Sequence, residues 1–274
     1  MSDLTRVDDS FELDAVDAAS TPGFIGDKTA GEAALKAGRK ALVELQAKLF
    51  AASKFDDKRS VLLVLQAMDT AGKGGILDHV LGGANPQGVL IHSFKAPTDE
   101  EKKHDFLWRI RRELPPPGYI GVFDRSHYED VLIHRVRQFS TPEQIEERYG
   151  LIAAFEQELV ASGTTIIKVM LHISRDEQRE RLEARLTDPT KQWKFNPGDI
   201  DERALWDSYQ EAYQIALTRT STVDAPWFVV PADRKWFARL AVQRLLLDAL
   251  RGLNLEWPTP EYDPAEQLAR LAAE

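Results

Sequence analysis

The sequence predicts an α/β fold in which a parallel sheet is covered by helices on both faces. Short apolar segments rich in Val, Ile and Leu alternate with longer segments of helical periodicity, which is the pattern of βαβ units. The apolar segments are nearly continuous rather than alternating, as expected of strands buried on both faces. With 274 residues and 43% apolar content, the chain is large enough for one substantial core.

Five strands are expected. They lie at residues 58–69, 88–94, 119–124, 164–173 and 226–233. The first, KRSVLLVLQAMD, is a short apolar run bounded by charge. Ligands of parallel sheets bind beyond the carboxyl ends of the strands, so the loops that follow residues 58–69 and 119–124 should meet at one edge.

Helical patterns fill the intervals between the strands. They lie at residues 31–53, 74–85, 97–114, 141–163, 174–188, 202–220 and 234–253. Leu35, Leu42, Leu45 and Leu49 recur on one helical face, which suits a surface helix packed on a core. Pro97-Thr98 followed by acids is a helix start, and Thr141 before Glu143 is a plausible cap.

The net charge of −9 belongs to the two ends of the chain. Residues 1–30 carry a net −5 and read as a loosely ordered acidic arm, and residues 253–274 carry a net −4 and form an acidic tail. The neutral body at 31–252 argues against a general nucleic-acid partner. No apolar run reaches the roughly 18 residues of a membrane span. Without cysteine or a secretory signal, we expect a cytoplasmic protein.

The loop after the first strand resembles an altered phosphate-binding loop. In AMDTAGKGG, Ala67 stands six residues before Lys73 where Gly is usual, and Gly74 follows it where Ser or Thr is usual. Glycines at 72, 74 and 75 allow close approach of a phosphate to backbone N–H groups at a helix start, and Lys73 adds a charge. The alternative is an ordinary βα turn with incidental glycines.

Carboxylates at the same edge indicate a cation. Asp69 lies inside the loop and Asp124 ends the third strand, so that together they could supply the one or two carboxylates that magnesium favours. Either carboxylate alone also fits a loop cap. Arg125 could clamp a phosphate, and Ser126 and Tyr128 could donate hydrogen bonds. His127 by itself fits an ordinary hydrogen-bonded loop histidine.

The segment at about 175–206 is a candidate lid. Its charged helix fits a solvated surface with ion pairs, but the loop TDPTKQWKFNPGDID places Trp193 and Phe195 among lysines. Kinases use such segments to exclude water and to bring arginines onto the transferred phosphoryl group.

Taken together, several motifs resemble the polyphosphate kinase 2 family in its short, single-domain form. They are AMDTAGKGG, NPQGV, SFKAPT, HDFLWRI, FDRSHYEDVL, DPTKQWKF and DAPWFVVPADRKWF, collinear over roughly residues 30–252. The resemblance implies a P-loop kinase three-layer sandwich with a five-stranded parallel sheet and a helical lid, similar to thymidylate kinase. It also implies reversible phosphoryl transfer between inorganic polyphosphate and purine nucleotides, with Mg²⁺, for which Mn²⁺ can substitute.

The resemblance also assigns site residues. The catalytic set is Asp69, Lys73, Asp124, Arg125 and Arg185, with Asp69 and Asp124 as metal ligands. The phosphate- or nucleotide-binding set is Thr70, Ala71, Gly72, Gly74, Gly75, Ser126, His127, Tyr128, Glu129, Lys194 and Asp201. Lys95 and Arg112 are weaker candidates for the polyphosphate groove. We expect a homo-oligomer, a dimer or a tetramer.

The stretch SHYED bears on which nucleotide accepts the phosphoryl group. SHYED resembles family members that take AMP, some of which also take ADP, whereas Asp124 replaces an asparagine of some AMP-using relatives. We expect AMP phosphorylation, with ADP as a second acceptor. The alternatives are an ADP-preferring polyphosphate kinase, an ATP-dependent nucleotide kinase of the same fold, a non-enzymatic module that binds polyphosphate or nucleic acid, and a decayed α/β domain.

Overall fold

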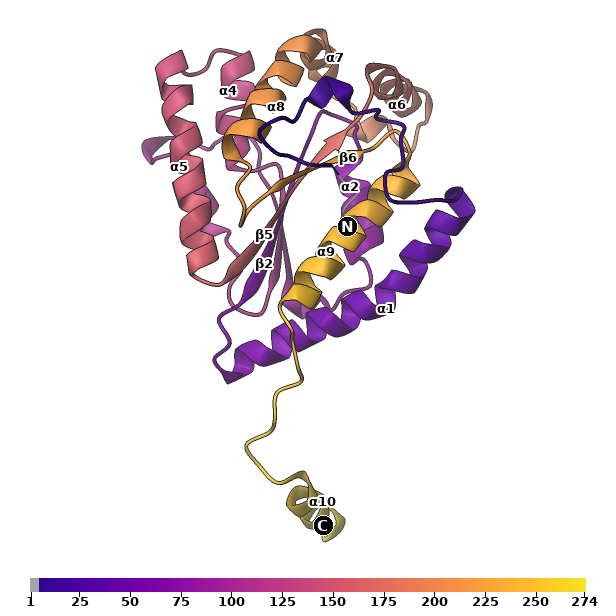
Figure 1. Cartoon of the computed structure of the whole chain (residues 1–274), viewed down its shortest axis with the longest axis vertical. Helices are drawn as coiled ribbons and strands as arrows, with labels where there is room; N and C mark the ends of the chain where they lie inside the picture. Colours follow the sequence, from indigo (N-terminus) through magenta and orange to yellow (C-terminus); the bar gives the residue numbers. More distant parts are fainter. Residues whose placement is uncertain (1–4) are drawn as a thin grey trace.

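A six-stranded sheet forms the centre of the molecule in the computed structural model, which describes residues 5–274 (Figure 1). The strands are β1 Thr5–Arg6, β2 Ser60–Ala67, β3 Val89–Ser93, β4 Ile120–Asp124, β5 Thr164–His172 and β6 Trp227–Pro231, in the order β1-β6-β5-β2-β4-β3. The strands from β2 to β6 pair in parallel, which confirms the predicted five-stranded parallel sheet. The short β1 pairs antiparallel with β6 and was not predicted.

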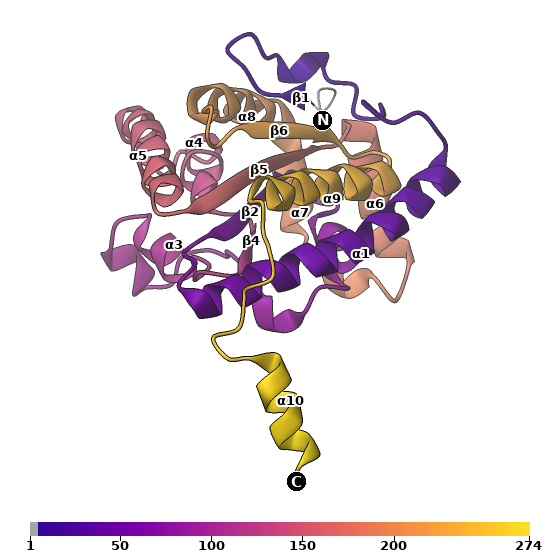
Figure 2. The same ribbon diagram turned by 60° about the horizontal axis from the view of Figure 1, so that its bottom comes forward.

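Helices cover both faces of the sheet (Figures 1 and 2). On one face α1, Lys28–Ala52, lies against α9, Lys235–Gly252; on the other, α5, Pro142–Ala161, lies beside α8, Trp206–Thr220. The shorter helices are α2 Lys73–Ile76, α3 Trp108–Arg112, α4 Ile133–Val136, α6 Arg175–Thr187, α7 Gly198–Ala204 and α10 Pro264–Ala272. None of the helices in residues 5–274 is both long enough and apolar enough to cross a bilayer.

Burial explains the pattern of the central strands. Every residue of β2 is buried, because β4 and β5 flank it in the sheet and helices cover both of its faces. Close packing of α1 on α9 depends on Gly31 and Gly38, where a Cβ atom would lie 2.2 Å and 2.3 Å from atoms of Trp236 and Gln243. The two helices therefore approach closely at these positions.

The predicted helix at residues 97–114 is wrong as a single element. The segment contains a 3₁₀ turn at Glu101–Lys103 and the short α3, separated by an extended His104. The side chain of Asp105 accepts a hydrogen bond from the Leu107 N–H at 3.0 Å, which restarts the helical turn. By contrast, the predicted helix in 74–85, expected to end at Gly82-Gly83, is confirmed, because α2 continues into a π-type turn at Leu77–Leu81 and the helical segment stops at Gly82.

The N-terminal segment packs on the body where a loosely ordered arm was expected. Its apolar residues Val7, Phe11 and Leu13 are buried. The side-chain amide of Gln214 on α8 accepts from the Leu13 N–H at 2.7 Å and donates to the Phe11 carbonyl at 2.8 Å. Three apolar side chains among many acids suffice to attach the segment, although its composition alone indicates disorder. Residues 1–4 lie outside the described part of the chain.

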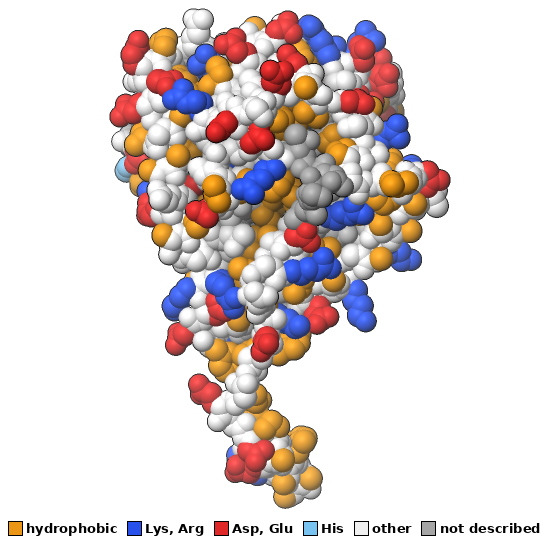
Figure 3. Space-filling view, in the orientation of Figure 1, with side chains coloured by type: hydrophobic (Ala, Val, Ile, Leu, Met, Phe, Trp, Pro, Cys, Tyr) orange, Lys and Arg blue, Asp and Glu red, His pale blue; other side chains and the backbone are white. Residues whose placement is uncertain are grey.

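The C-terminal helix α10 stands away from the body at the end of an extended linker (Figures 1 and 2). Leu268 and Leu271 lie one turn apart on α10 and are both exposed. Figure 3 shows apolar side chains gathered on one side of this helix. The tail is therefore amphipathic as well as acidic.

The attachment of the N-terminal segment can be tested with Leu13→Ala. Leu13 is 1% exposed, so we expect the free energy of unfolding to fall by about 2–5 kcal/mol in urea titrations. The matched control is Ile25→Ala, in the same segment but fully exposed, which should leave the urea midpoint unchanged. Equal midpoints for both variants and the wild type would mean that the segment is not packed.

Candidate functional site

The parallel pairing of β2 with β4 builds the site at one edge of the sheet. Leu65 lies opposite Asp124 in the register, and the Arg125 N–H donates to the Leu65 carbonyl at 3.0 Å. The loop after β2 therefore starts beside the loop after β4. Across the gap, the Arg125 guanidinium lies 3.2 Å from the Asp69 carboxylate. The meeting of the two loops expected from the sequence is present.

The loop after β2 has free backbone donors. Within residues 5–274 the N–H groups of Gly72, Lys73, Gly74 and Gly75 have no hydrogen-bond acceptor. Gly74 faces open space, since a Cβ atom placed there would have no heavy atom within 4 Å. Thr70 and Gly72 take positive φ angles of 66° and 114°, which turn the chain sharply. The loop can thus accept an anion on its backbone.

Lys73 lies between the two loops. Its side chain is only 12% exposed, and its Nζ lies 3.5 Å from the Ala67 carbonyl and 3.8 Å from Asp124 Oδ1. The second carboxylate oxygen, Oδ2, accepts from the Ser93 hydroxyl at 3.3 Å. Lys73 therefore brings its charge to the space between the loop after β2 and the end of β4.

The carboxylates at this edge have unused ligand capacity. Asp124 Oδ1 is buried and lacks a hydrogen-bond partner among the described residues. A buried carboxylate oxygen that accepts no hydrogen bond, with only the Lys73 charge 3.8 Å away, can still take a further ligand. No group of three or more His, Asp or Glu side chains gathers into a metal site in residues 5–274. The two carboxylates Asp69 and Asp124 fit a cation such as magnesium, which binds few protein ligands and keeps waters and phosphates.

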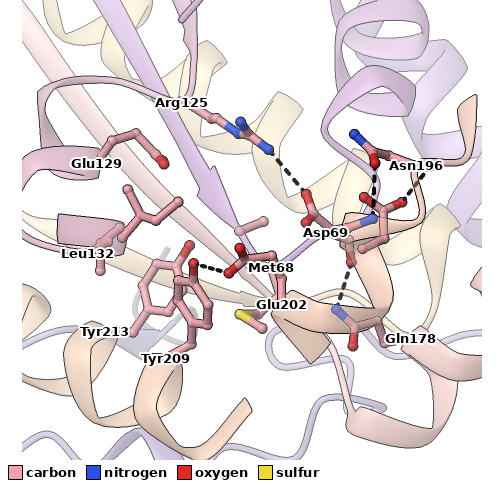
Figure 4. A pocket seen from close by; sticks show the side chains of 14 residues that line it. Met68, Asp69, Arg125, Glu129, Leu132, Gln178, Asn196, Glu202, Tyr209 and Tyr213 are labelled. Atoms are coloured by element: carbon pink, nitrogen blue, oxygen red, sulfur yellow. Dashed lines mark hydrogen bonds and ion pairs between the residues drawn. The ribbon is translucent and has the colours of Figure 1, made fainter. Parts of the chain in front are cut away.

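A cavity of about 230 Å³ lies beside these loops (Figure 4). Figure 4 shows the charged side chains of Asp69, Arg125 and Glu129 on its wall, together with Leu132 and Tyr213. The lid contributes further residues, and α8 contributes both Tyr209 and Tyr213. The cavity thus combines a charged end with an apolar wall, as sites for small molecules usually do.

Acidic groups crowd the charged end. Burial raises the pKa of Glu129, although the Arg125 and Lys73 charges act against that shift. Burial also raises the pKa of Asp199, and the nearby Asp69 charge adds to the effect. With its amide nitrogen turned toward Glu129, Gln66 donates to that carboxylate at 3.0 Å. Positive charge, from a bound cation or from the protein, is needed to offset these carboxylates.

The lid closes the cavity from the other side. Arg185 on α6 forms an ion pair with Asp199 on α7 at 3.3 Å and donates to the Lys194 carbonyl at 3.2 Å. Arg137, after α4, pairs with Glu202 at 2.7 Å, and the Tyr209 hydroxyl donates to the same carboxylate at 2.6 Å. These contacts hold α7 against the body.

Several predicted residues lie outside the cavity wall. Asp201 is exposed and is not among the lining residues; Asp199, two positions earlier, is. Lys194 is exposed with its Nζ over the Trp193 ring at 5.0 Å. Lys95 is exposed, and Arg112 stacks over Trp108 at 4.7 Å. These four residues offer surface charge rather than a built pocket.

The prediction that Ser126, His127 and Tyr128 contact phosphate or nucleotide is corrected by their burial. All three are at most 1% exposed and point into the protein. Ser126 Oγ accepts from the Tyr128 N–H at 3.2 Å, and the Tyr128 hydroxyl donates to Glu156 on α5 at 2.8 Å. The His127 ring also contacts Glu156, at 3.3 Å. These residues hold the loop that carries Arg125 instead of lining the cavity.

A buried ion pair lies under that loop. Lys168 on β5 is 2.5 Å from Glu156 and also donates to the Tyr128 hydroxyl at 3.0 Å and to the Thr220 carbonyl at 2.7 Å. Burial raises the pKa of Glu156, but the Lys168 charge and the His127 contact outweigh it, so its pKa lies below the usual value. Burial lowers the pKa of Lys168, although the charge of Glu156 acts in the opposite direction. The sequence analysis missed this pair.

The sequence analysis also missed residues of the lid and of α8. Asp199, Glu202, Tyr209 and Tyr213 line the cavity, as does the buried Gln178 of α6, and Arg181 is buried one turn further along the same helix. Gln178 and Arg181 are three residues apart in a helix otherwise rich in exposed charges. The spacing puts them on one face, but it does not say that this face is buried.

The chain matches a known protein family. The model of the polyphosphate kinase 2 family matches residues 26–257. A curated relative from Meiothermus ruber, named AMP/ADP-polyphosphate phosphotransferase, is 46% identical over 93% of this chain and 94% of its own length. Another from Rhodopseudomonas palustris, named ADP-polyphosphate phosphotransferase, is 44% identical over 82% of this chain and 80% of its own length.

Solved structures agree. The crystal structure of polyphosphate kinase 2 from Arthrobacter aurescens TC1 is 56% identical and superposes with a TM-score of 0.97, over 98% of this chain and 95% of that one. A putative polyphosphate kinase 2 from Pseudomonas aeruginosa PA01 is 34% identical, with a TM-score of 0.80 over 88% of this chain and 50% of that one.

The support under the Arg125 loop can be tested with Glu156→Gln. We expect it to lower the free energy of unfolding by about 3–5 kcal/mol, because Lys168 would remain buried without a counter-charge. Urea unfolding measures the change. The control is Glu158→Gln on the same helix, whose pair with Arg111 is exposed and should contribute about 1 kcal/mol or less. A Glu156 variant no less stable than the control would contradict this interpretation.

Proposed function

The chain belongs to the polyphosphate kinase 2 family and is a polyphosphate-dependent nucleotide phosphotransferase, and we propose that it phosphorylates AMP, with ADP as a second acceptor. The observation that carries the proposal is the junction of β2 and β4. There Lys73 Nζ lies 3.8 Å from the buried Oδ1 of Asp124, which accepts no hydrogen bond from the described residues, next to a loop with free N–H donors. The relative from Meiothermus ruber, named for both AMP and ADP, supports the choice of acceptors.

The transferred group moves between two phosphate oxygens. A terminal oxygen of the nucleotide attacks the terminal phosphorus of polyphosphate, one P–O bond forms, and the bond to the rest of the chain breaks. The attacking oxygen is already anionic, so that no strong general base is required. Catalysis then depends on positioning and on charge stabilisation.

Positive groups face this space from three elements. We assign charge stabilisation to Lys73, to Arg125 after β4 and to Arg185 on the lid. The backbone N–H groups of residues 72–75 bind phosphate oxygens in this scheme. The ion pairs of Arg125 with Asp69 and of Arg185 with Asp199 support it, because each arginine is already held by a carboxylate that lines the cavity.

A divalent ion belongs to the same proposal. Asp69 and Asp124 would hold Mg²⁺, or Mn²⁺ in its place, and the orphaned Oδ1 of Asp124 supports the assignment. When bound, such an ion offsets charge on the phosphate oxygens of the substrates.

The nucleotide would occupy the cavity. Leu132 and Tyr213 offer an apolar wall to a purine base, while Glu129 offers acceptors for hydroxyl or amino groups. We propose that polyphosphate runs over the outer face of the loop after β2, with the exposed Lys95, Arg112 and Lys194 as further contacts.

Assembly and location are further parts of the proposal. We infer a homo-oligomer, which the exposed apolar residues Leu90 and Ile91 on the edge strand β3 support. We place the reaction in the cytoplasm, which the absence of cysteine supports.

The acceptor can be tested by product analysis. Incubation with polyphosphate, Mg²⁺ and AMP, without ATP, should give ADP, followed by a smaller amount of ATP. Parallel reactions with ADP, GMP and GDP measure base and phosphate selectivity. Formation of ADP only when ATP is supplied would indicate an ATP-dependent kinase, and polyphosphate binding without any product would indicate a non-enzymatic module.

The carboxylate assignment can be tested with Asp124→Asn and Asp69→Asn. We expect each variant to lose at least about 100-fold in kcat, because the cation loses a ligand, while the melting temperature stays near that of the wild type. The control is Asp207→Asn, an acid on α8 whose side chain is 91% exposed, which should keep full activity. Activity within a few-fold of the control would contradict the assignment.

A further inference from the structure

We propose that Gln178 and Arg181 of α6 are positioning residues that fix the backbone of the phosphate-binding loop. The inference rests on the proposed function and deepens it, because it says what gives the loop after β2 its shape. In this proposal neither side chain is a phosphate ligand at the charged end of the cavity. They act through the carbonyl groups of three loop residues, Asp69, Thr70 and Ala71.

The contacts are consecutive along the loop. Gln178 Nε2 donates to the Asp69 carbonyl at 3.1 Å. One terminal nitrogen of Arg181 donates to the Thr70 carbonyl at 3.0 Å and to the Ala71 carbonyl at 2.9 Å. Three successive carbonyl oxygens are thus all held by side chains one helical turn apart on α6. Figure 4 shows Gln178 directed at the loop next to Asp69.

Arg181 has no donor left for a substrate. Its second terminal nitrogen donates to the carbonyls of Ala232 and Asp233, at 2.6 Å and 3.0 Å, and its Nε pairs with Glu177 at 2.7 Å. All five N–H groups of the guanidinium are therefore used within the protein. Since Arg181 is 7% exposed, it cannot act as a lid arginine on the phosphoryl group. It connects the loop after β2 to the start of α9.

The direction of these carbonyls decides what the loop can bind. In a trans peptide the C=O and the following N–H point in opposite directions, so a carbonyl held toward α6 turns the next N–H away from α6. With the Ala71 carbonyl on Arg181, the Gly72 N–H is left free for an anion. A carbonyl oxygen released from α6 could instead turn toward the phosphates and repel them. The positive φ of Thr70 also needs such support.

The same face of α6 connects the loop to the lid. Gln178 Oε1 accepts from Arg203, at the end of α7, at 2.9 Å. Arg203 also donates to the Arg175 carbonyl at 2.6 Å. The buried amide of Gln178 therefore joins a lid helix to the Asp69 carbonyl, with its oxygen bonded to Arg203 and its nitrogen to the loop.

The experiment compares Arg181→Lys with the matched control Arg179→Lys on the same helix. Arg179 is exposed and, among the described residues, pairs only with Asp176 and Glu183 of α6. Lysine cannot reproduce the fork of the Arg181 guanidinium. We expect Arg181→Lys to lower kcat/KM for polyphosphate by about tenfold or more, and kcat/KM for AMP less, whereas the control matches the wild type. Hydrogen–deuterium exchange should rise at residues 70–75 and stay unchanged in β2 and α9.

A second variant tests the proposal even if Arg181→Lys does not fold. Gln178→Glu keeps the shape of the side chain and its acceptor for Arg203, but replaces the donor to Asp69 by an oxygen. It should raise exchange in the loop and lower kcat/KM for polyphosphate in the same direction.

Three results would overturn the proposal. The first is that the folded variants show the same hydrogen–deuterium exchange in the loop, and the same kcat/KM for polyphosphate, as the control. Another is an exchange increase spread over the whole protein, with equal losses for both substrates, which would mean general destabilisation. The third is normal loop exchange in Gln178→Glu. A wild-type protein without polyphosphate-dependent activity would contradict the proposed function instead, and the exchange data would still test the contacts with α6.

Discussion

The parallel pairing of β2 with β4 is the constraint on which the rest of the site depends. It sets Leu65 opposite Asp124, so that the loop after one strand and the loop after the other leave the sheet side by side. Lys73 and Arg125 then reach across the gap, one toward Asp124 and the other toward Asp69. A shift of this register would separate the charges that the site brings together.

Each of the two loops contains a residue with a positive φ angle. A buried, positively charged side chain, Arg or Lys, holds each loop in place. Thr70 and Arg125 have φ angles of 66° and 63°, which are unfavourable for residues other than glycine. Arg181 holds the carbonyls around Thr70, and Lys168, through Glu156 and Tyr128, holds the segment that follows Arg125. Because both of these side chains are buried, their charges act within the protein, while Lys73 lies 3.8 Å from Asp124 and Arg185 pairs with Asp199, which lines the cavity.

Buried groups also join the lid to the body. On α6, Arg185 pairs with Asp199, which lines the cavity, while Arg181, one turn earlier on about the same face, is buried against the loop after β2. Helix α8 follows the lid and ends at Thr220, whose carbonyl accepts from Lys168. Both α6 and α8 therefore contact residues that hold a loop of the site.

The sequence by itself determined the parallel sheet, the position of the altered phosphate loop and the charged residues at the carboxyl edge, because these depend on local periodicity, on turns and on strand order. Only the tertiary structure decided which side chains face the cavity. His127 and Tyr128 look like donors in SHYED, yet they point into the core, and Arg181 looks like a solvated helix residue, yet it is buried. The attachment of the N-terminal segment by Leu13 and the break at His104 also differ from the loosely ordered arm and the continuous helix that the sequence predicted. Burial depends on contacts between residues far apart in the chain, and local patterns do not contain those contacts.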